Sequence, residues 1–316
     1  MFKIIEFDID QINLDEFIEM YKLCLNKKID KKYIQWKYRE NPAGSMCGFI
    51  AYDVNSKMAA FYGVIPERFE IEGKSCIVYQ SVDTMTHPNY QKMGLFTALA
   101  KKTYEKIYSK TDNQFIFGIP GSNSFHGFIK KLNWKFLGNI NYIFCHKLRF
   151  ISFNKFNSNT TVLTLNDDIN ELTDFFKNNF CNEMIHLNYS INYFNWKIAN
   201  YPFDGLNTIT LKKNNVITSF LVFSIDNKNR CFVECYLSLE KTGKDLKLII
   251  EYLFTKTNSY WIYTWDSVIF KKIGFIKNPF EFGPFSYKMP FIIFSNISTQ
   301  IFDKNNFRLE PIIQDK

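Results

Sequence analysis

The chain of 316 residues has few of the residues that hold metals or build disulfide frameworks. Its seven cysteines include no Cys-x-x-Cys pair, and its four histidines do not cluster with them. An odd, unpatterned set of thiols in a chain of this length is typical of a reducing compartment. We therefore expect free cysteines and no bound metal.

Long apolar runs and charge blocks are also missing. No run approaches the roughly 20 residues that cross a bilayer, and residues 1–10 lack the apolar core of a signal peptide. The formal net charge of +8 comes from scattered lysines, and no nucleic-acid-binding motif is present. These features predict a cytoplasmic protein that binds neither membrane nor nucleic acid. Its basic surface could steer a polyphosphorylated ligand, although lysine pairs are equally typical of solvated helix faces.

The most informative segment is residues 82–96. It begins with β-branched residues that favour a strand, Pro88 ends that strand, and apolar residues from Leu95 onward recur at helical spacing. Such a turn leaves backbone N–H groups free at the positive end of a helix, where a pyrophosphate can bind. Gly94 lets the phosphates approach because it has no Cβ.

Residues 86–96 resemble the pyrophosphate loop of the GNAT superfamily of acyl-CoA-dependent N-acyltransferases, whose core pattern is Gln/Arg-x-x-Gly-x-Gly/Ala. Gln91 and Gly94 match the pattern, whereas Phe96 stands where glycine or alanine is usual, so we expect a ring beside the phosphates. The resemblance covers about residues 1–150 and implies coenzyme A as the acyl carrier. The cofactor-binding residues that it implies are Thr84, Met85, Thr86, Gln91, Lys92, Met93, Gly94, Leu95, Phe96, Asn123 and Phe125.

The order of the predicted elements also matches that family. We expect a strand over 1–7, helices near 13–26 and 31–38, hairpins turning at 55–56 and 72–73, a long strand over 75–87, the pyrophosphate helix, a strand near 114–119, a helix near 124–131 and two strands within 135–149. This order predicts an α/β (α+β) fold with a mixed, mainly antiparallel sheet flanked by helices.

The second half of the chain repeats the first. The matching segments are 33–42 with 193–202, 128–134 with 270–275, and 15–25 with 170–180. Because they occur in the same order, they predict tandem GNAT-like domains, here placed at 1–151 and 152–316.

The two halves are not equivalent. Residues 239–245 of the second half, which correspond to the pyrophosphate loop, contain Glu240 and Asp245. Their negative charge would oppose a pyrophosphate. We therefore expect one coenzyme A site, in the first half, and a second domain that walls the acceptor cleft.

The resemblance implies that an amine attacks the thioester directly while both substrates are bound. Backbone near Met85 would hold the oxyanion, and Asp83 is the candidate base, directly or through water; its alternative role is a structural hydrogen bond to a helix. Ile129 stands where the family often has the tyrosine that protonates the thiolate, so His126 is the candidate acid, unless it is a surface histidine. Gln80 occupies the place of a glutamate in some relatives, and a mechanism without a dedicated base stays open.

The segment around Trp36 resembles one found in two-domain GNAT proteins of bacterial surface-polysaccharide pathways. Aromatic rings suit a sugar face, and a lysine there could meet a phosphate. The candidate substrate-binding residues are Trp36, Lys37, Tyr38, Trp265 and Asp266. The recurrence of Trp36 as Trp196 in the repeat equally indicates a shared structural position.

These features predict acyl transfer from acyl-CoA to the amine of a nucleotide-linked amino sugar, for example a dTDP-aminodideoxyhexose, by a monomer or homodimer. A peptide or aminoglycoside amine is an alternative acceptor, which an acidic cleft would favour. A non-catalytic acyl-CoA-binding scaffold is the alternative from another class.

Overall fold

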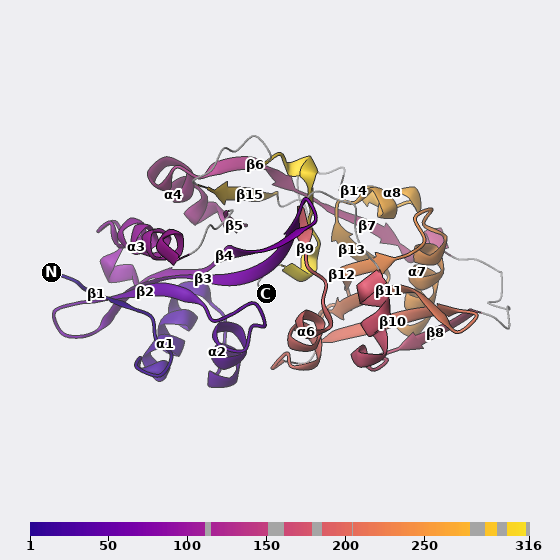
Figure 1. Cartoon of the computed structure of the whole chain (residues 1–316), viewed down its shortest axis with the longest axis horizontal. Coiled ribbons are helices and arrows are strands. Elements are labelled where there is room, and N and C mark those ends of the chain that lie inside the picture. Colours follow the sequence, from indigo (N-terminus) through magenta and orange to yellow (C-terminus); the bar gives the residue numbers. More distant parts are fainter. Residues whose placement is uncertain are drawn as a thin grey trace.

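The computed structural model describes residues 1–110, 115–150, 161–178, 185–203, 205–278, 288–295 and 302–313. These residues form two mixed sheets that lie side by side, each flanked by helices (Figure 1). The predicted α/β fold with two flanked sheets is therefore confirmed.

The first sheet is built mostly from the first half of the chain. Its strands, in spatial order, are β1 (Lys3–Glu6), β2 (Cys47–Tyr52), β3 (Met58–Ile71), β4 (Lys74–Thr86), β5 (Ile116–Gly118), β15 (Met289–Phe294) and β6 (Lys135–Ile140), with β9 (Ile185–Leu187) on β3 and β16 (Phe307–Arg308) on β9. The long β3–β4 hairpin turns at Glu72 (φ 49°) and Gly73 (φ 75°), two left-handed residues that match the twist of a tight hairpin.

The second sheet repeats this plan. Its strands, in spatial order, are β14 (Ile276–Lys277), β7 (Tyr142–His146), β13 (Trp261–Trp265), β12 (Cys231–Ser238), β11 (Val216–Ile225), β10 (Leu206–Lys213) and β8 (Thr161–Leu165).

Helices flank both sheets (Figure 1). Their bounds are α1 (Leu14–Leu25), α2 (Lys31–Tyr38), α3 (Leu95–Lys110), α4 (Ser122–Leu132), α5 (Thr173–Asn178), α6 (Ile191–Phe194), α7 (Lys244–Lys256) and α8 (Val268–Lys272). In Figure 1, α1 and α2 lie below the first sheet, and α3 and α4 lie above it. Asn13 caps α1 as predicted, since its side chain accepts hydrogen bonds from the amides of Asp15 and Glu16.

The predicted repeat is present in the structure, with an exchange of strands. The order β2-β3-β4-α3-β5-α4-β6 recurs as β10-β11-β12-α7-β13-α8-β14. However, β15 from the second half lies between β5 and β6, and β7 from the first half lies between β13 and β14. The sheets thus do not divide at the predicted boundary of 151/152, which itself lies outside the described residues. Residue 114 and the end of the helix predicted over 170–180 also lie outside them.

The halves meet through a reciprocal tryptophan contact. Trp36 and Trp196 stack with their ring centroids 4.9 Å apart. The indole N–H of Trp36 donates to the carbonyl of Trp196 at 2.7 Å, and that of Trp196 donates to the carbonyl of Trp36 at 2.9 Å. The repeated tryptophan is therefore a shared structural position, as one of the two interpretations of the sequence held.

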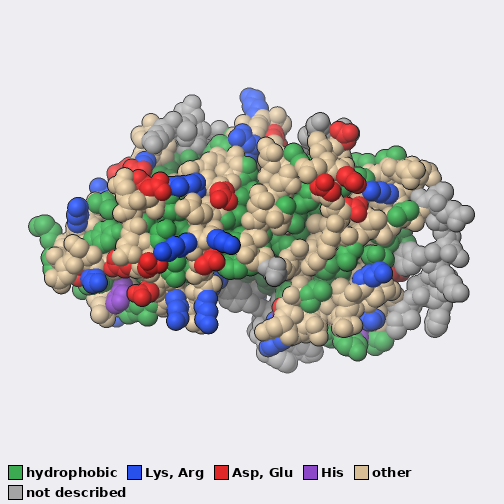
Figure 2. Space-filling view, turned by 90° about the horizontal axis from the view of Figure 1, so that it is seen from below, with side chains coloured by type: hydrophobic (Ala, Val, Ile, Leu, Met, Phe, Trp, Pro, Cys, Tyr) green, Lys and Arg blue, Asp and Glu red, His purple; other side chains and the backbone are tan. Residues whose placement is uncertain are grey.

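Charge is dispersed over the face of the molecule that is seen from below (Figure 2). Figure 2 shows basic and acidic side chains interspersed over the face seen from below, in line with the scattered lysines of the sequence. Among the described helices, none combines the length and the apolar character needed to span a bilayer.

Candidate active site

A pocket opens where two parallel strands of the first sheet separate. Among the described residues, β4 pairs with β5 at Tyr79–Ile116 and Gln80–Phe117, and it then continues to Thr86 beside β3 and without β5. The space between them has a volume of about 450 Å³. We call it the donor pocket; the residues that line it are Leu25, Lys27, Gln80, Ser81, Val82, Asp83, Thr84, Gly118, Ile119, Pro120, Gly121, Ser124, Phe128 and Met289.

A β-bulge in β4 shapes the wall of this pocket. Phe61 of β3 faces Met85, but Gly63 faces Val82, so the register slips at Asp83 and the residue after it. Asp83 has a φ of 47°, a left-handed conformation that an L-residue adopts only when its surroundings hold it there. The bulge interrupts the regular β3–β4 pairing, which resumes at Met85, close to the level where β4 and β5 separate.

The side chain of Asp83 is held by helices α1 and α2. Its carboxylate accepts hydrogen bonds from the Tyr21 hydroxyl at 2.7 Å and the Tyr38 hydroxyl at 2.6 Å, and it forms an ion pair with Lys37. The side chains of Lys37 and Asp83 are only 1% and 3% exposed. A buried charge needs such a partner, so this cluster fixes the left-handed turn of the bulge.

This geometry changes the expected roles of several residues. The Asp83 carboxylate is turned toward the helices, and mainly its backbone faces the donor pocket, so its alternative, structural role fits the geometry better than direct contact with an amine. Lys37 and Tyr38 cannot serve as free phosphate or sugar contacts, because they are buried against Asp83. Trp36 was also expected at the substrate, but it is 4% exposed and stacked on Trp196.

The loop after β4 has the form of an anion site. Residues 91–94 are exposed, Lys92 and Gly94 have φ values of 64° and 79°, and helix α3 begins directly afterwards with Leu95. The loop is anchored, because the Tyr90 hydroxyl donates to Asp53 at 2.7 Å. The amides at the start of a long helix then face solvent, as a pyrophosphate requires.

The ring of Phe96 does not lie beside the loop as expected. It packs against Tyr62 and Phe128, with centroids 6.0 and 5.1 Å apart. A Cβ on Gly127 would come within 2.9 Å of the Phe96 ring. The glycine of α4 thus makes room for the phenylalanine that replaces a small residue of the family pattern.

The remaining predicted residues are spread around the donor pocket. Thr84 lines it, Thr86 is half-buried at the end of β4, and the side chains of Met85 and Leu95 are core residues at 1% and 5% exposure. Gln91, Lys92 and Met93 are exposed in the loop.

Three predicted residues of α4 do not reach the pocket wall. Asn123 and His126 are exposed, and Phe125 packs on Phe136 at 5.7 Å; none of the three lines the donor pocket. The proposed role of His126 as the acid does not fit this placement, because a proton donor has to be within hydrogen-bond reach of the thiolate.

Sequence reasoning missed much of the lining. Leu25 and Lys27 come from the end of α1, Ser124 from α4, and Met289 from a strand of the other half. No local pattern marks these residues, because strand exchange and helix packing bring them to the pocket. Gln80 was noted only as a residue that cannot act as a base.

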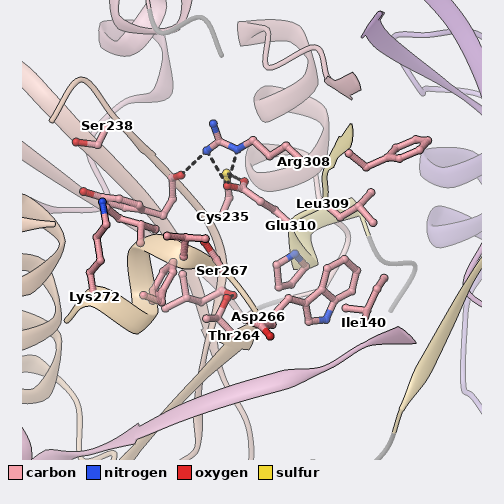
Figure 3. Close-up of a pocket in the computed structure, with 18 of the residues that line it drawn as sticks. Ile140, Cys235, Ser238, Thr264, Asp266, Ser267, Lys272, Arg308, Leu309 and Glu310 are labelled. Carbon is pink, nitrogen blue, oxygen red and sulfur yellow. Dashed lines mark hydrogen bonds and ion pairs between the residues drawn. The ribbon is translucent and has the colours of Figure 1, made fainter. Parts of the chain in front are cut away.

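A second cavity of about 480 Å³ lies where β12 and β13 separate in the other half. Trp265 and Asp266 both line it. Figure 3 shows Asp266 and Thr264 toward one end, and Arg308, Glu310 and Cys235 together at the other. Glu310 accepts hydrogen bonds from the Arg308 guanidinium at 2.9 Å and from the Cys235 thiol at 2.7 Å. Residues 307–311 thus form part of the wall of this cavity.

Asp266 and Trp265, the two predicted substrate-binding residues in that cavity, differ in their hydrogen-bond partners. Asp266 is paired with Lys271 at 2.7 Å and Lys277 at 2.9 Å. Burial raises the pKa of Asp266, but hydrogen bonds and charges of these lysines outweigh it and hold the pKa below its usual range. The indole N–H of Trp265 is buried without a hydrogen-bond partner among the described residues.

In the second half, an acidic side chain of the protein occupies the loop that corresponds to the phosphate loop. The Glu240 carboxylate accepts hydrogen bonds from the amides of Thr242, Gly243 (3.0 Å) and Asp245 (3.2 Å) at the start of α7. Burial raises the pKa of Glu240, but these hydrogen bonds outweigh it and hold the pKa below its usual range. An internal carboxylate therefore occupies the amides that a pyrophosphate would need, which supports a single coenzyme A site.

We expect calorimetry to give one coenzyme A bound per chain. The physical reason is that Glu240 takes the amides at the start of α7, whereas the first turn of α3 contains no acidic residue. Two equivalent sites in the titration would contradict this assignment of Glu240.

Comparison with known proteins bears on the first half directly. Residues 8–137 match the family model described as the acetyltransferase (GNAT) domain. This stretch contains α1, the bulge at Asp83 and the loop at Gly94. Residues 8–137 are a GNAT acetyltransferase domain. The protein is accordingly an acyl-CoA-dependent N-acyltransferase, with coenzyme A as the carrier of the acyl group. No curated protein matches the sequence.

Solved structures share the whole two-sheet fold. A probable N-acyltransferase of Enterococcus faecalis V583 superposes with a TM-score of 0.69 at 9% identity, over 93% of this chain and 72% of that one. A tandem GNAT protein from the clavulanic acid biosynthesis pathway gives 0.63 at 8% identity, over 93% and 98%. The N-myristoyltransferase of Saccharomyces cerevisiae, with bound myristoyl-CoA, gives 0.60 at 13%, over 93% and 79%. At these identities the likeness shows the tandem GNAT fold alone.

Proposed function

We propose that the GNAT domain acylates the amine of an anionic small molecule, a nucleotide-linked amino sugar such as a dTDP-aminodideoxyhexose. The acyl donor binds with its phosphates on residues 91–95 and its arm along β4. The thioester then lies near the bulge, where backbone N–H groups around Met85 can stabilise the oxyanion.

The charge of the donor pocket supports an anionic acceptor. Lys27 and Asp83 are the charged residues that line it. Asp83 is neutralised by Lys37, whereas Lys27 is exposed at the rim. The wall thus has a net positive charge, which attracts an anionic acceptor and repels a polycation.

The second cavity is the proposed place for the nucleotide end of the acceptor. Met289 lines the donor pocket and Ile140 lines the second cavity, and these two residues are register partners on β15 and β6. The cavities are therefore neighbours, separated by one cross-strand pair. The unpartnered indole N–H of Trp265 and the exposed Lys272 at the rim supply a donor and a cation for a phosphate-bearing ligand.

The chain contributes chiefly alignment to this reaction. Holding an amine against a thioester carbonyl is worth up to about 7–11 kcal/mol, and the bulge positions the backbone that faces both groups. Asp83 supports this geometry through Tyr21, Lys37 and Tyr38. The amine proton leaves through water, since among the described lining residues Asp83 is the one carboxylate and its side chain is buried.

Thiol release in the presence of acyl-CoA and a panel of amines tests this proposal. We expect turnover with dTDP- or UDP-linked amino sugars, weaker turnover with the free amino sugars, and a KM for the nucleotide sugar that rises when Trp265 is changed to Phe. Preference for an aminoglycoside or a basic peptide would contradict the anionic acceptor. Absence of turnover with every amine, despite coenzyme A binding, would favour the scaffold alternative.

A further inference from the structure

A chain of hydrogen bonds leads from the core of the first half to the donor pocket. The indole N–H of Trp134 donates to the Tyr104 hydroxyl at 3.0 Å. The hydroxyl oxygens of Tyr104 and Tyr62 are 3.0 Å apart, and those of Tyr62 and Ser81 are 2.9 Å apart. Trp134, Tyr104 and Tyr62 are at most 5% exposed. Ser81 is half-buried and lines the donor pocket, so it is the end of the chain that a ligand can meet.

The direction of these hydrogen bonds follows from the tryptophan. An indole nitrogen can only donate, so the Tyr104 oxygen accepts, and its own hydrogen is left for Tyr62. The Tyr62 hydrogen is then left for the Ser81 oxygen. Among the described residues, no acceptor remains for the Ser81 hydrogen, which can therefore be donated into the donor pocket. Burial raises the pKa of the Tyr62 and Tyr104 hydroxyls, so both stay protonated and keep this direction.

Ser81 lies at the inner end of the donor pocket. It follows Gln80, whose pairing with Phe117 is the last between β4 and β5 among the described residues. A Cβ on Gly118 of β5 would lie 3.7 Å from the Ser81 Cβ. The bulge at Asp83 is two residues farther along β4, or about 7 Å of strand. With the thioester at the bulge, the serine side chain and one hydrogen bond span most of the distance to the sulfur.

The departing sulfur has no other evident donor. When the tetrahedral intermediate collapses, the C–S bond breaks and its electron pair stays on the sulfur as a thiolate. Ile129 stands where the family often has a tyrosine, and His126 is exposed and does not line the pocket. A hydroxyl that donates to a charged atom forms one of the stronger hydrogen bonds, so a donor at this point would favour departure of the sulfur.

We propose that Ser81 donates a hydrogen bond to the departing sulfur, and that Trp134, Tyr104 and Tyr62 are positioning residues that turn the serine hydrogen toward the pocket. This inference rests on the placement of the acyl donor in the proposed function. Ser81 keeps its proton throughout, because a hydroxyl is a weaker acid than a thiol. The amine releases one proton to water and the thiolate takes one from water, so the protein is unchanged after each turnover.

Titration of the thiol of bound coenzyme A tests the inference without any acceptor. The ultraviolet absorbance of the thiolate follows the titration on the whole chain, with the complex of desulfo-coenzyme A as the reference that lacks the thiol. A hydrogen bond to the charged form lowers the pKa of an acid. We therefore expect the pKa of the bound thiol to be about 1–2 units lower in the wild type than in Ser81→Ala.

Three further variants separate this role from a general effect on the pocket. Ser124 also lines the pocket, but its hydroxyl donates to the Gly121 carbonyl at 3.3 Å, so Ser124→Ala should keep the wild-type thiol pKa. Ser81→Thr, which retains a hydroxyl, should also keep it. Trp134→Phe removes the N–H that sets the direction and leaves Ser81 intact, so part of the pKa shift should be lost.

Equal thiol pKa values in the wild type and Ser81→Ala, or an equal change in Ser124→Ala, would overturn the inference. If Ser81→Ala does not fold, Ser81→Cys takes its place, because a thiol of similar size is a much weaker donor. In turnover, kcat should fall about tenfold in Ser81→Ala, while the Kd for coenzyme A changes little. Failure of the proposed acceptor is a separate result, because it leaves the titration of the bound thiol unchanged.

Discussion

Replacing Gly94 with valine should raise the Kd for coenzyme A by about 100-fold or more, since charge-assisted hydrogen bonds to phosphate contribute roughly 1.5–3 kcal/mol each. Gly94 has a φ of +79°, and a Cβ there would project into open space with no protein atom within 4 Å. A side chain would therefore meet the ligand and not the protein. Calorimetry on the folded variant measures the effect.

Gly73 offers a matched control for this prediction. It has a φ of +75°, open space around its Cβ position, and a place in the β3–β4 hairpin turn, away from the loop. Gly73→Val should therefore lose a similar amount of stability from backbone strain, about 1–3 kcal/mol, and keep its coenzyme A affinity. Unchanged coenzyme A affinity in a folded Gly94→Val protein, or equal losses of affinity in both variants, would show that the loop is not part of the binding site.

Changing Asp83 to asparagine should reduce the free energy of unfolding by about 3–5 kcal/mol, because it leaves Lys37 as a buried charge without a counterion. Turnover should fall more than in His126→Ala, whose side chain is exposed and off the pocket, while coenzyme A affinity stays nearly constant. Chemical denaturation and steady-state kinetics measure the two effects.

The double variant Asp83→Asn with Lys37→Met separates a positioning role from a base. If Asp83 acts by holding the bulge, removing the unpaired ammonium should restore part of the stability and part of the turnover. If Asp83 is the base, stability should recover but turnover should not. Near-wild-type turnover in Asp83→Asn alone would contradict both roles.

The sequence predicted the fold well where local chemistry decides it. The cap at Asn13, the hairpin turn at Glu72-Gly73 and the loop before Leu95 each need a conformation or a side-chain contact that only a few residue types supply. The internal repeat likewise predicted two similar halves. Strand exchange left no local signal, because β7 and β15 have the same β-forming composition whichever sheet they join.

The site was harder to predict for a related reason. Lys37 and Tyr38 have the residue types of a substrate-binding segment, but tertiary packing turned them toward Asp83. Phe96 was expected beside the phosphates, yet Gly127, more than 30 positions away, provides its pocket. In each case the side chain is plausible for function, and its partner elsewhere in the chain decides its role.

A crystal structure with bound coenzyme A tests the central claim most directly, namely that the first half alone binds the acyl donor between β4 and β5. We predict the pyrophosphate on the amides of residues 91–95 and the arm along β4, with the thiol near the bulge at Asp83. The loop at Glu240 should contain no ligand. Coenzyme A bound at the second cavity, between β12 and β13, would contradict the account.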